Sequence, residues 1–579
     1  MVSSPRLIKN GSPGRAFSVL CGCLAVGLLM LSLAGCKQNE SNVRPGVLTV
    51  AQEQQSSWVR NFHPFLPMGV ARWGTSAGIY EPLMIFNRMT GEYVPWLATS
   101  YAWRGNAEAL VFTIRDGVLW SDGEPFTAAD VVYTFNLLKE NPALDTGGLW
   151  AYLSSVEADE EGRVVMVFSR PYSPGLMSLA QLPIVPQHVW SKLEDPITFT
   201  NPNPVATGPF TEVLSFESQV YELGRNPRYW KEGYPKVEAL RFPAFPTNEQ
   251  VTLALINGEL DWAGSFVPAI DRIYVAKDPE HHGYWFPAVA GSVYLYPSQW
   301  VDDFHDGRVR KALSLALDRE MINRVAMYNY TRLPEPAGLS DGYAKWRHPD
   351  IRPGDGWVHF DPAAASRLLD EAGYRRSGEA GIRVGPDGNP MSYEISVIAG
   401  WSDWVRACQV MARNLQAVGI DAKVKAYDFT GWFEKVQRGE FELSIGWADD
   451  GPTPYRVFRG IMATETVKPF GENTYVNWHR FGNQEADDLL THFERTVDFA
   501  EQQKIAWRLQ EIYIEEAPAI PIFLNPSWGE YNTRRFVGWP TAENPYVRLS
   551  TNHPPEPLIV MTRLQPAPVS ATAQKGDMQ

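Results

Sequence analysis

The stretch VFTIRDGVLWSDGEPFTAADVVYTF, residues 111–135, shows the local pattern on which the fold of this chain is built. Leu110, Phe112 and Ile114 recur at every second position, which is the period of a β-strand. Asp116-Gly117 then interrupts the run, and this dipeptide is typical of a hairpin turn. The sequence therefore predicts a strand that ends in a hairpin.

The second half of the same stretch predicts a helix. Thr127 and Asp130 have the spacing of a capping box, in which each side chain bonds to the backbone N–H group of the other residue. Val131, Phe135 and Leu138 follow at spacings of four and three residues, so they would lie on one face of the helix. A strand, a turn and a capped helix in direct succession indicate a mixed α and β fold.

Helices and strands alternate along the rest of the chain. DGRVRKALSLALDRE, residues 306–320, has the apolar stripe of a helix. DPAAASRLLDEAGY, residues 361–374, has Asp361 as a cap, Pro362 at the first helical position and a stop at Gly373. Short apolar runs such as SVIAG and FELSIGW fit buried strands. A chain of 579 residues also exceeds the size of a single hydrophobic core, so we expect an α/β architecture with several lobes.

The first residues are typical of an exported lipoprotein. A basic segment precedes an apolar run over residues 17–33, and LAGC, residues 33–36, closes this run with small residues before a cysteine. LAGC resembles the bacterial lipobox, which implies that residues 1–35 are removed as a signal peptide and that Cys36 becomes the lipid-modified first residue. We therefore expect a lipid-anchored tether over residues 36–46 and a periplasmic or other extracytoplasmic location at a membrane.

Cysteine usage and charge narrow the possible functions. Cys21 and Cys23 would leave with the signal peptide, so Cys408 stays alone in the body of the protein and no intrachain disulfide is expected. No other apolar run reaches the ~18 residues of a membrane span. A formal net charge of −14 argues against a nucleic-acid partner. The small, polar C-terminal segment predicts a disordered tail over residues 563–579.

Motifs for catalysis or metal binding are weak in this sequence. GTSAG, residues 74–78, has the pattern of a nucleophile elbow around Ser76, but its flanks do not read as the strand and helix that this chemistry needs, so a flexible loop is expected instead. The histidines are scattered, and the neighbouring His281 and His282 are poorly spaced for a metal. We expect no catalytic residue, no metal and no cofactor, with an exported glycosidase or esterase as an alternative.

The stretch SIGWADDGPTPY, residues 444–455, places Asp449 and Asp450 side by side. The two acids of a glycoside hydrolase flank the scissile bond at ~5–10 Å and usually come from separate elements. Consecutive residues of an extended segment point in opposite directions, so at most one of the two acids is expected to face a given cleft. The pair is therefore not predicted to be catalytic.

Several segments of the chain share the pattern of one protein family. Besides residues 111–135 they are PWLATSYAW (95–103), TGPF (207–210), RNPRYWKEGYPKVEALRFPAF (225–245), VRKALSLALDREMI (309–322) and DPAAASRLLDEAGY (361–374). Together they resemble the family 5 extracytoplasmic solute-binding proteins of ABC importers, which include dipeptide-, oligopeptide-, nickel- and oligosaccharide-binding members. The resemblance covers about residues 47–548.

This resemblance implies a hinged, two-lobed α/β fold of the periplasmic-binding-protein kind, type II, in the three-domain form of family 5. Ligand would be enclosed between lobes that close on it, because contacts to both lobes stabilise the closed state. The implied domains are a discontinuous domain I (47–85, 205–289 and 526–562), a domain II inserted into that lobe (86–204) and a domain III that forms the second lobe (290–525).

The resemblance also suggests a role for one acid. Dipeptide- and oligopeptide-binding relatives have a Trp, an Asp three residues later and a Pro seven residues later, and this Asp pairs with the α-ammonium group of the peptide. Trp447, Asp450 and Pro454 have this spacing, so Asp450 is the implied ligand-binding acid. A buried carboxylate favours a cationic ligand because its desolvation is costly without one. The alternative is that Asp450 caps the turn before Pro452 or faces solvent.

Other segments resemble the branch of the family that binds cello- and related β-oligosaccharides: INGELDWAGSFVPAI (256–270), YWFP (284–287) and GPTPY (451–455). Sugar rings lay their apolar C–H faces on aromatic rings, so this branch implies aromatic platforms. The candidate platforms, each with a structural role as the alternative, are Trp262, Trp285, Trp401, Trp404, Trp432 and Trp447. The acidic pair departs from this branch, and both ligand classes stay open.

The sequence thus predicts a monomeric, lipid-anchored solute-binding protein of an ABC importer, without enzymatic activity. It would capture an oligopeptide or a β-linked oligosaccharide of the cello type and deliver it to the permease and ATPase subunits. A surface receptor with the same fold is a further alternative.

Overall fold

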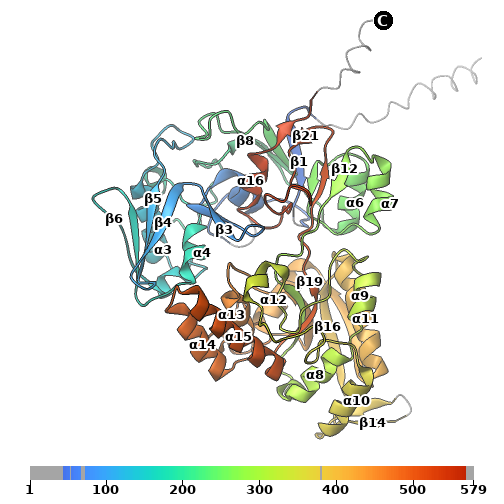
Figure 1. Ribbon diagram of the computed structural model, residues 1–579. Coiled ribbons are helices and arrows are strands. Elements are labelled where there is room, and N and C mark those ends of the chain that lie inside the picture. Colours follow the sequence, from blue (N-terminus) through green and yellow to red (C-terminus); the bar gives the residue numbers. More distant parts are fainter. Residues whose placement is uncertain (1–43, 53, 67–71, 379–380, 569–579) are drawn as a thin grey trace, which may run out of the picture. The chain divides into compact units, whose positions relative to one another are not determined.

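The computed structural model of the protein describes residues 44–52, 54–66, 72–378 and 381–568 (Figure 1). The predicted signal peptide, the lipid-attachment residue Cys36 and the end of the predicted tail, residues 569–579, lie outside the described residues. Within the described ranges, no helix is both long enough and apolar enough to cross a membrane.

The largest sheet has seven strands in the order β12-β20-β11-β1-β10-β9-β8. Strand β1 runs parallel to both of its neighbours, and the other pairings are antiparallel. The strands are β1 (Val47–Ala51), β8 (Phe210–Glu217), β9 (Val220–Arg225), β10 (Ala239–Pro243), β11 (Trp262–Ala263), β12 (His282–Tyr284) and β20 (Glu530–Asn532). All of them fall within the three segments predicted for domain I.

A second sheet has five strands in the order β17-β16-β18-β13-β19. Strands β17, β16 and β18 are parallel, and β13 is antiparallel to β18 and β19. The strands are β13 (Ser292–Pro297), β16 (Ser392–Ile398), β17 (Asp421–Tyr427), β18 (Leu443–Trp447) and β19 (Ile520–Leu524). The runs SVIAG and FELSIGW lie in β16 and β18 as predicted. The five strands fall within residues 290–525, and the domain boundaries themselves stay predictions.

A third sheet is antiparallel, in the order β4-β5-β7-β6. Its strands are β4 (Ala98–Arg104), β5 (Ala109–Ile114), β6 (Leu153–Ala158) and β7 (Val164–Phe168), and helix α3 (Ala128–Glu140) packs beside them (Figure 1). The strand and helix predicted from residues 111–135 are confirmed as β5 and α3. Thr127 and Asp130 form the capping box at the start of α3.

The hairpin predicted after this strand is wrong. The chain turns at Asp116-Gly117 but does not return to pair with β5, because β4 and β7 already occupy both edges of that strand. It folds on itself instead, and the Phe126 N–H donates to the Val118 carbonyl at 3.0 Å.

The remaining elements are α-helices, short π-helical and 3-10 helical segments, and short two-stranded ribbons. The helices are α2 (Arg72–Gly74), α4 (Gly175–Ala180), α5 (Gln187–Trp190), α6 (Asn248–Ile256), α7 (Ile270–Ile273), α8 (Gly307–Leu315), α9 (Arg319–Val325), α10 (Pro362–Glu371), α11 (Ser402–Ala417), α12 (Phe429–Arg438), α13 (Tyr455–Met462), α14 (Gln484–Glu494), α15 (Phe499–Glu516) and α16 (Pro557–Met561). The short π-helical and 3-10 helical segments are η1 (Thr75–Ile79), η2 (Leu149–Ala151), η3 (Val275–Lys277), η4 (Asp302–His305), η5 (Asp341–Trp346) and η6 (Thr464–Thr466). The ribbons are β2 (Met84–Asn87) with β3 (Glu92–Pro95), β14 (Arg375–Ser377) with β15 (Ile382–Val384), and β21 (Phe536–Val537) with β22 (Gln565–Pro566).

Two helices, α8 and α10, form where the sequence patterns predicted them, and their contacts explain why. In α8, Val309, Ala312 and Leu313 are fully buried against the five-stranded sheet, which confirms the predicted apolar stripe. At the start of α10 the Asp361 carboxylate accepts the Ala364 N–H at 2.8 Å and so caps the helix.

Two segments expected to be irregular adopt regular structure. Residues 74–78 belong to α2 and the π-helical turn η1, where Ala77 and Ile79 are fully buried, so the expected flexible loop is wrong. The described residues directly before η1 form the helix α2 and not a strand. In the predicted tail, β22 pairs with β21, which corrects the tail prediction for residues 563–568.

Candidate functional site

A cavity of 660 Å³ is lined by segments that follow strands of the seven-stranded and the five-stranded sheet. This volume is typical of pockets that enclose a small ligand. The lining segments follow β16, β17, β18 and β19, whose carboxyl ends share one edge because all four run in the same direction. Others follow the parallel strands β1 and β11. Loops at the carboxyl ends of parallel strands are the usual place for a ligand site in an α/β protein.

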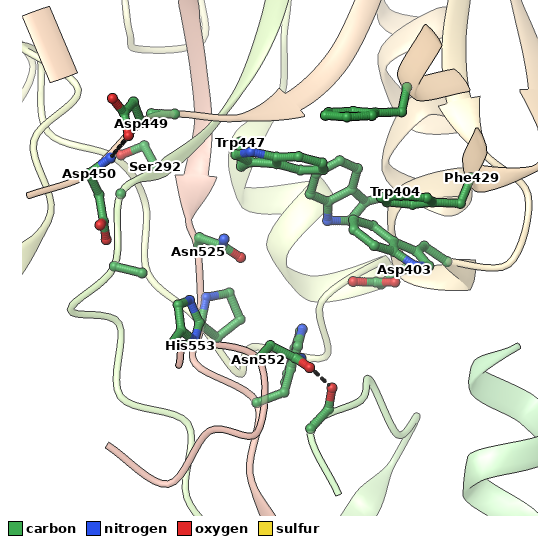
Figure 2. Close-up of a pocket in the computed structure, with 18 of the residues that line it drawn as sticks. Ser292, Asp403, Trp404, Phe429, Trp447, Asp449, Asp450, Asn525, Asn552 and His553 are labelled. Atoms are coloured by element: carbon green, nitrogen blue, oxygen red, sulfur yellow. Dashed lines mark hydrogen bonds between the residues drawn. The ribbon is translucent and has the colours of Figure 1, made fainter. Parts of the chain in front are cut away.

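Aromatic side chains form one wall of the cavity (Figure 2). Trp401 and Trp404 follow β16, and their ring centroids are 4.7 Å apart in an edge-on contact. Trp447 ends β18 and stacks on Phe433 at 6.1 Å. Phe429 and Phe433 lie one turn apart on α12, so both face the cavity. The wall therefore offers several ring faces at different angles.

Three of the six candidate tryptophans, Trp401, Trp404 and Trp447, line this cavity. They come from two segments that are distant in the sequence, and the parallel pairing of β16 with β18 brings them together. Trp401 and Trp447 are partly exposed, whereas Trp404 is buried.

The structure places the other three candidates away from the cavity. Trp432 is fully buried behind the wall, with its ring centroid 5.2 Å from that of Trp447. Trp262 is buried in a different core and contacts Trp539 at 5.8 Å. Trp285 is half-buried against the same core as Trp262. In each case the ring packs on core side chains, so it presents no face to this cavity.

Asp450 lines the cavity, but an arginine already neutralises it. Its Oδ1 is 2.7 Å from Nη2 of Arg88, which follows strand β2 and is almost fully buried, while the Asp450 side chain is 23% exposed. Arg88 Nη1 also donates to the Gly451 carbonyl. Burial raises the pKa of the Asp450 carboxyl, but Arg88 and Arg548 outweigh it, and the pKa lies below its ordinary value. The carboxylate is thus ionised and paired before any ligand arrives.

Asp449 also lines the cavity and has its own arginine. Its two carboxylate oxygens accept from Nε and Nη2 of Arg456, each at 3.1 Å, in a bidentate pair. The expectation that at most one of the two acids faces the cleft is wrong. It assumed an extended segment, and strand β18 ends at Trp447, before the two acids.

A third acid and a third arginine complete this end of the cavity. Arg548 pairs with Glu556, and Glu556 Oε1 accepts the Arg88 backbone N–H at 2.6 Å. His553, which lines the cavity beside them, stays neutral because burial and Arg548 hold its pKa well below its ordinary value. The arginines 88, 456 and 548 therefore balance the acids 449, 450 and 556, and the cluster carries no net charge.

Asp403 is a further acid in the cavity wall, and the sequence pattern did not single it out. It lies in the first turn of α11 and is 3% exposed. Burial raises its pKa to about 7, although backbone N–H groups and the Asn248 amide act in the opposite direction. Asn248 Nδ2 donates to Asp403 Oδ1 at 3.4 Å. Within the part of the chain that the structure describes, no salt bridge reaches Asp403.

A series of hydrogen bonds connects Asp403 to segments of the seven-stranded sheet. Trp401 Nε1 donates to Gln54 Oε1 at 3.0 Å, and Gln54 Nε2 donates to Asn248 Oδ1 at 2.8 Å. Ser265 Oγ donates to the same Asn248 oxygen at 2.8 Å. All five side chains line the cavity, so a ligand there touches groups that belong to both sheets.

These polar residues have a signal that a sequence search can use. Gln54 and Ser265 follow β1 and β11, while Asp403 follows β16, so each comes shortly after the carboxyl end of a parallel strand. A search for polar residues after predicted buried strands would have found Asp403 in SVIAGWSDW.

One serine–histidine contact borders the cavity. Ser550 Oγ lies 2.9 Å from His553 Nδ1, but Ser550 is 2% exposed and does not line the cavity. The low pKa of His553 makes it a weak base. Among the described residues, no group of three His, Cys, Asp or Glu side chains is arranged to hold a metal ion. The cavity therefore provides aromatic faces and hydrogen-bonding groups, which suit ligand binding.

Comparison with known proteins identifies the family. The family model described as "Bacterial extracellular solute-binding proteins, family 5 Middle" matches residues 92–467, more than half of the chain. The chain belongs to this family. Protein XP55 of Streptomyces lividans is 31% identical to this solute-binding protein over 335 residues, which are 55% of this chain and 56% of XP55. Glutathione-binding protein GsiB of Salmonella typhi is 23% identical over 441 residues, 74% of this chain and 79% of GsiB.

A solved structure shares the fold over nearly its whole length. It is the periplasmic oligopeptide-binding protein of an oligopeptide ABC transporter from Thermotoga maritima, with mannohexaose bound. Its TM-score with this solute-binding protein is 0.81, at 27% sequence identity, and the match covers 90% of this chain and 99% of that chain. The family resemblance and the two-lobed α/β fold expected from the sequence are confirmed. The family consists of solute-binding proteins rather than enzymes.

Proposed function

We propose that this protein is the extracytoplasmic solute-binding component of an ABC importer and that its solute is an oligosaccharide. The salt bridge between Arg88 and Asp450 is the observation that favours a sugar ligand over a peptide ligand. A peptide bound in the manner of the dipeptide-binding relatives needs that carboxylate for its α-ammonium group, and the peptide would have to displace a buried arginine to reach it. A neutral sugar requires no such exchange.

The rest of the cavity supports the same ligand class. The rings of Trp401, Trp404 and Trp447 are apolar surfaces of the kind on which sugar C–H faces rest. Asp403 lies beside Trp404, and Asn525 lines the cavity between the aromatic wall and His553 (Figure 2). A carboxylate accepts hydrogen bonds from hydroxyl groups, and an amide both donates and accepts them. This combination matches the alternating apolar and hydroxyl surfaces of a sugar chain.

The Thermotoga maritima relative adds weight to this proposal. It carries an oligopeptide-transport name, yet its structure contains mannohexaose. A six-unit sugar chain thus fits a protein of the same fold and similar sequence. We extend oligosaccharide binding to the present chain because its cavity wall is rich in tryptophan.

Ligand capture would work through the contacts between the two sheets. A solute that touches Gln54 and Asn248 on one side and Trp401 and Asp403 on the other stabilises the state in which these groups are close together. The importer's permease would then receive the unaltered solute. Attachment to a membrane through a lipid on Cys36, and the three-domain boundaries predicted above, belong to the same proposal.

Peptide binding is the second candidate. It is favoured by the name of GsiB as a glutathione-binding protein and by the position of Asp450 in the cavity lining. In this case a peptide ammonium group would replace Arg88 as the partner of Asp450.

Titration calorimetry with mannohexaose, cellohexaose and short peptides tests the two candidates. For a sugar ligand, Asp450→Asn should change the binding free energy by less than ~1 kcal/mol, because the carboxylate is already paired with Arg88. For a peptide ligand the same variant should lose ~2–5 kcal/mol. Asp449→Asn is the matched control, since it changes the neighbouring acid.

Two results would overturn the sugar proposal. One is tight peptide binding that Asp450→Asn abolishes, with no response to either hexasaccharide. The other is release of shorter sugars from a hexasaccharide incubated with the protein, which would indicate a hydrolase. Native mass spectrometry of the protein as purified identifies a solute retained from the cell.

A further inference from the structure

Outside the cavity, two large aromatic side chains are exposed to solvent beside each other. Trp300 is 47% exposed and Phe470 is 55% exposed. Their ring centroids are 5.5 Å apart at an interplanar angle of 78°. Grouped exposed aromatic rings mark an interaction surface more often than single exposed apolar residues do.

This pair lies at the outer end of the helix that lines the cavity. Phe429, Phe433 and Gln437 of α12 are spaced four residues apart and all line the cavity, so this helix face runs for about 12 Å along the wall. Gly439 ends α12 with a left-handed backbone conformation, and a Cβ atom there would lie 3.2 Å from Nε1 of Trp300. The Trp300 side chain therefore lies against the C-terminal end of α12, the helix that faces the cavity.

Tyr475 connects the inner and the outer region. It lines the cavity and is also 57% exposed, so it lies at the rim. The backbone N–H groups of Gly471 and Thr474 each donate at 2.9 Å to a carbonyl in the last turn of α12. These bonds fix the loop that carries Phe470 and Tyr475 against the end of that helix.

We infer that Trp300, Phe470 and Tyr475 form an outer platform that binds sugar units of an oligosaccharide whose other end lies in the cavity. This inference rests on the proposed oligosaccharide function. Sugar rings present apolar C–H faces to aromatic rings, and exposed rings on a fixed loop supply such faces at little cost in conformational entropy. Tyr475 makes this surface continuous with the rim of the cavity. The occupant is therefore a ligand that extends out of the cavity and not a separate protein partner.

The test is titration calorimetry of the full-length protein with manno- and cello-oligosaccharides from the disaccharide to the octasaccharide. Affinity should rise with length beyond the chain that fills the cavity. Trp300→Ala and Phe470→Ala should weaken binding of the longest sugars roughly threefold to tenfold and leave the shortest bound ligands unchanged. Phe360→Ala removes a ring that is 48% exposed elsewhere, and it should change nothing.

Three results would overturn the outer platform. Affinity that is independent of length overturns it and leaves the oligosaccharide function intact. Absence of binding to every oligosaccharide overturns both. In the third result, Trp300→Ala binds long sugars as the unaltered protein does, but its self-association or its stimulation of the importer's ATPase is altered. This result assigns the surface to a protein partner. Because both residues are exposed, thermal unfolding of the variants should match that of the unaltered protein.

Discussion

Asp450 and Asp403 line the same cavity at opposite ends, and their surroundings give them different properties. Asp450 pairs with Arg88, and its pKa lies below the ordinary value. Asp403 is more deeply buried, has the Asn248 amide as its side-chain partner, and its pKa is raised to about 7. Burial disfavours the charge in both places, so the arginine makes the difference.

This difference indicates what each acid can do for a ligand. Asp450 has its charge satisfied within the protein and contributes mainly to holding Arg88 and the 449–451 segment in place. Among the described residues Asp403 forms no salt bridge with an arginine, and it lies beside the aromatic wall, so its carboxyl group can form hydrogen bonds with ligand hydroxyl groups. The acid that fits the peptide pattern is therefore the less available one.

The largest effect is expected from Arg88→Met, which removes the partner of Asp450. An unpaired carboxylate in this position should lower the free energy of unfolding by about 3–5 kcal/mol, measured by urea denaturation at pH 7. Arg163→Met is the matched control. Arg163 pairs with Asp159 at the surface, where water screens both charges, so this variant should lose much less stability than Arg88→Met. Equal losses in the two variants would remove the distinction between the cavity pair and a surface pair.

The double variant Arg88→Met/Asp450→Leu sharpens this test. It removes both charges, so its loss should be smaller than that of Arg88→Met alone. A double variant that is less stable than the single variant would show that Arg88 acts through its packing and its bond to Gly451 instead.

The next effect concerns the pH dependence of stability, through Asp403→Asn. Between pH 3.8 and about 7 the folded protein retains a proton on Asp403 that the unfolded chain has released, so this residue lowers stability as the pH rises through that window. Asp403→Asn removes this loss. The free energy of unfolding of the variant minus that of the unaltered protein should therefore be larger at pH 8 than at pH 4 by roughly 2–4 kcal/mol.

Urea denaturation of both proteins from pH 4 to pH 8 measures this difference. Glu81 and Asp261 also have raised pKa values, so the comparison between variant and unaltered protein is needed to isolate Asp403. A pH-independent difference would mean that Asp403 does not titrate in this range. If Asp403 accepts ligand hydroxyls, the variant should also bind oligosaccharides more weakly at pH 8.

The smallest effect is expected from single rings of the wall. Trp401→Ala removes one platform and the bond to Gln54, and it should lower hexasaccharide affinity by about 1–2 kcal/mol in titration calorimetry. Trp285→Ala removes a tryptophan that does not line the cavity and should leave affinity within ~0.5 kcal/mol. If Trp285→Ala weakens binding as much as Trp401→Ala, the cavity described here is not the sugar site.

Local signals in the sequence were sufficient for single elements. The capping box at Thr127 and the Asp361-Pro362 start each specify their helix through bonds within a few residues, so α3 and α10 were predictable. The hairpin at Asp116-Gly117 was not, because whether a strand edge is free depends on β7, which lies about fifty residues further along the chain.

The site was predictable only in part, for the same reason. Trp447 and Asp450 were found through a spacing pattern, and both line the cavity. The pattern did not contain Arg88, which comes from a distant ribbon and changes the meaning of Asp450. The resemblance to the oligosaccharide-binding branch, in turn, did not separate Trp432 from Trp447. Trp432 is covered by the core, and only the packing of α12 shows this.

The order of strands in the largest sheet has a consequence for biosynthesis. Strand β12 pairs only with β20 among the described residues, and β20 also borders β11, so residues 530–532 join two strands that the ribosome made much earlier. A nascent chain that ends before Glu530 holds every strand of the five-stranded sheet but an incomplete first sheet. The largest sheet therefore cannot be completed until nearly all of the polypeptide has been translated.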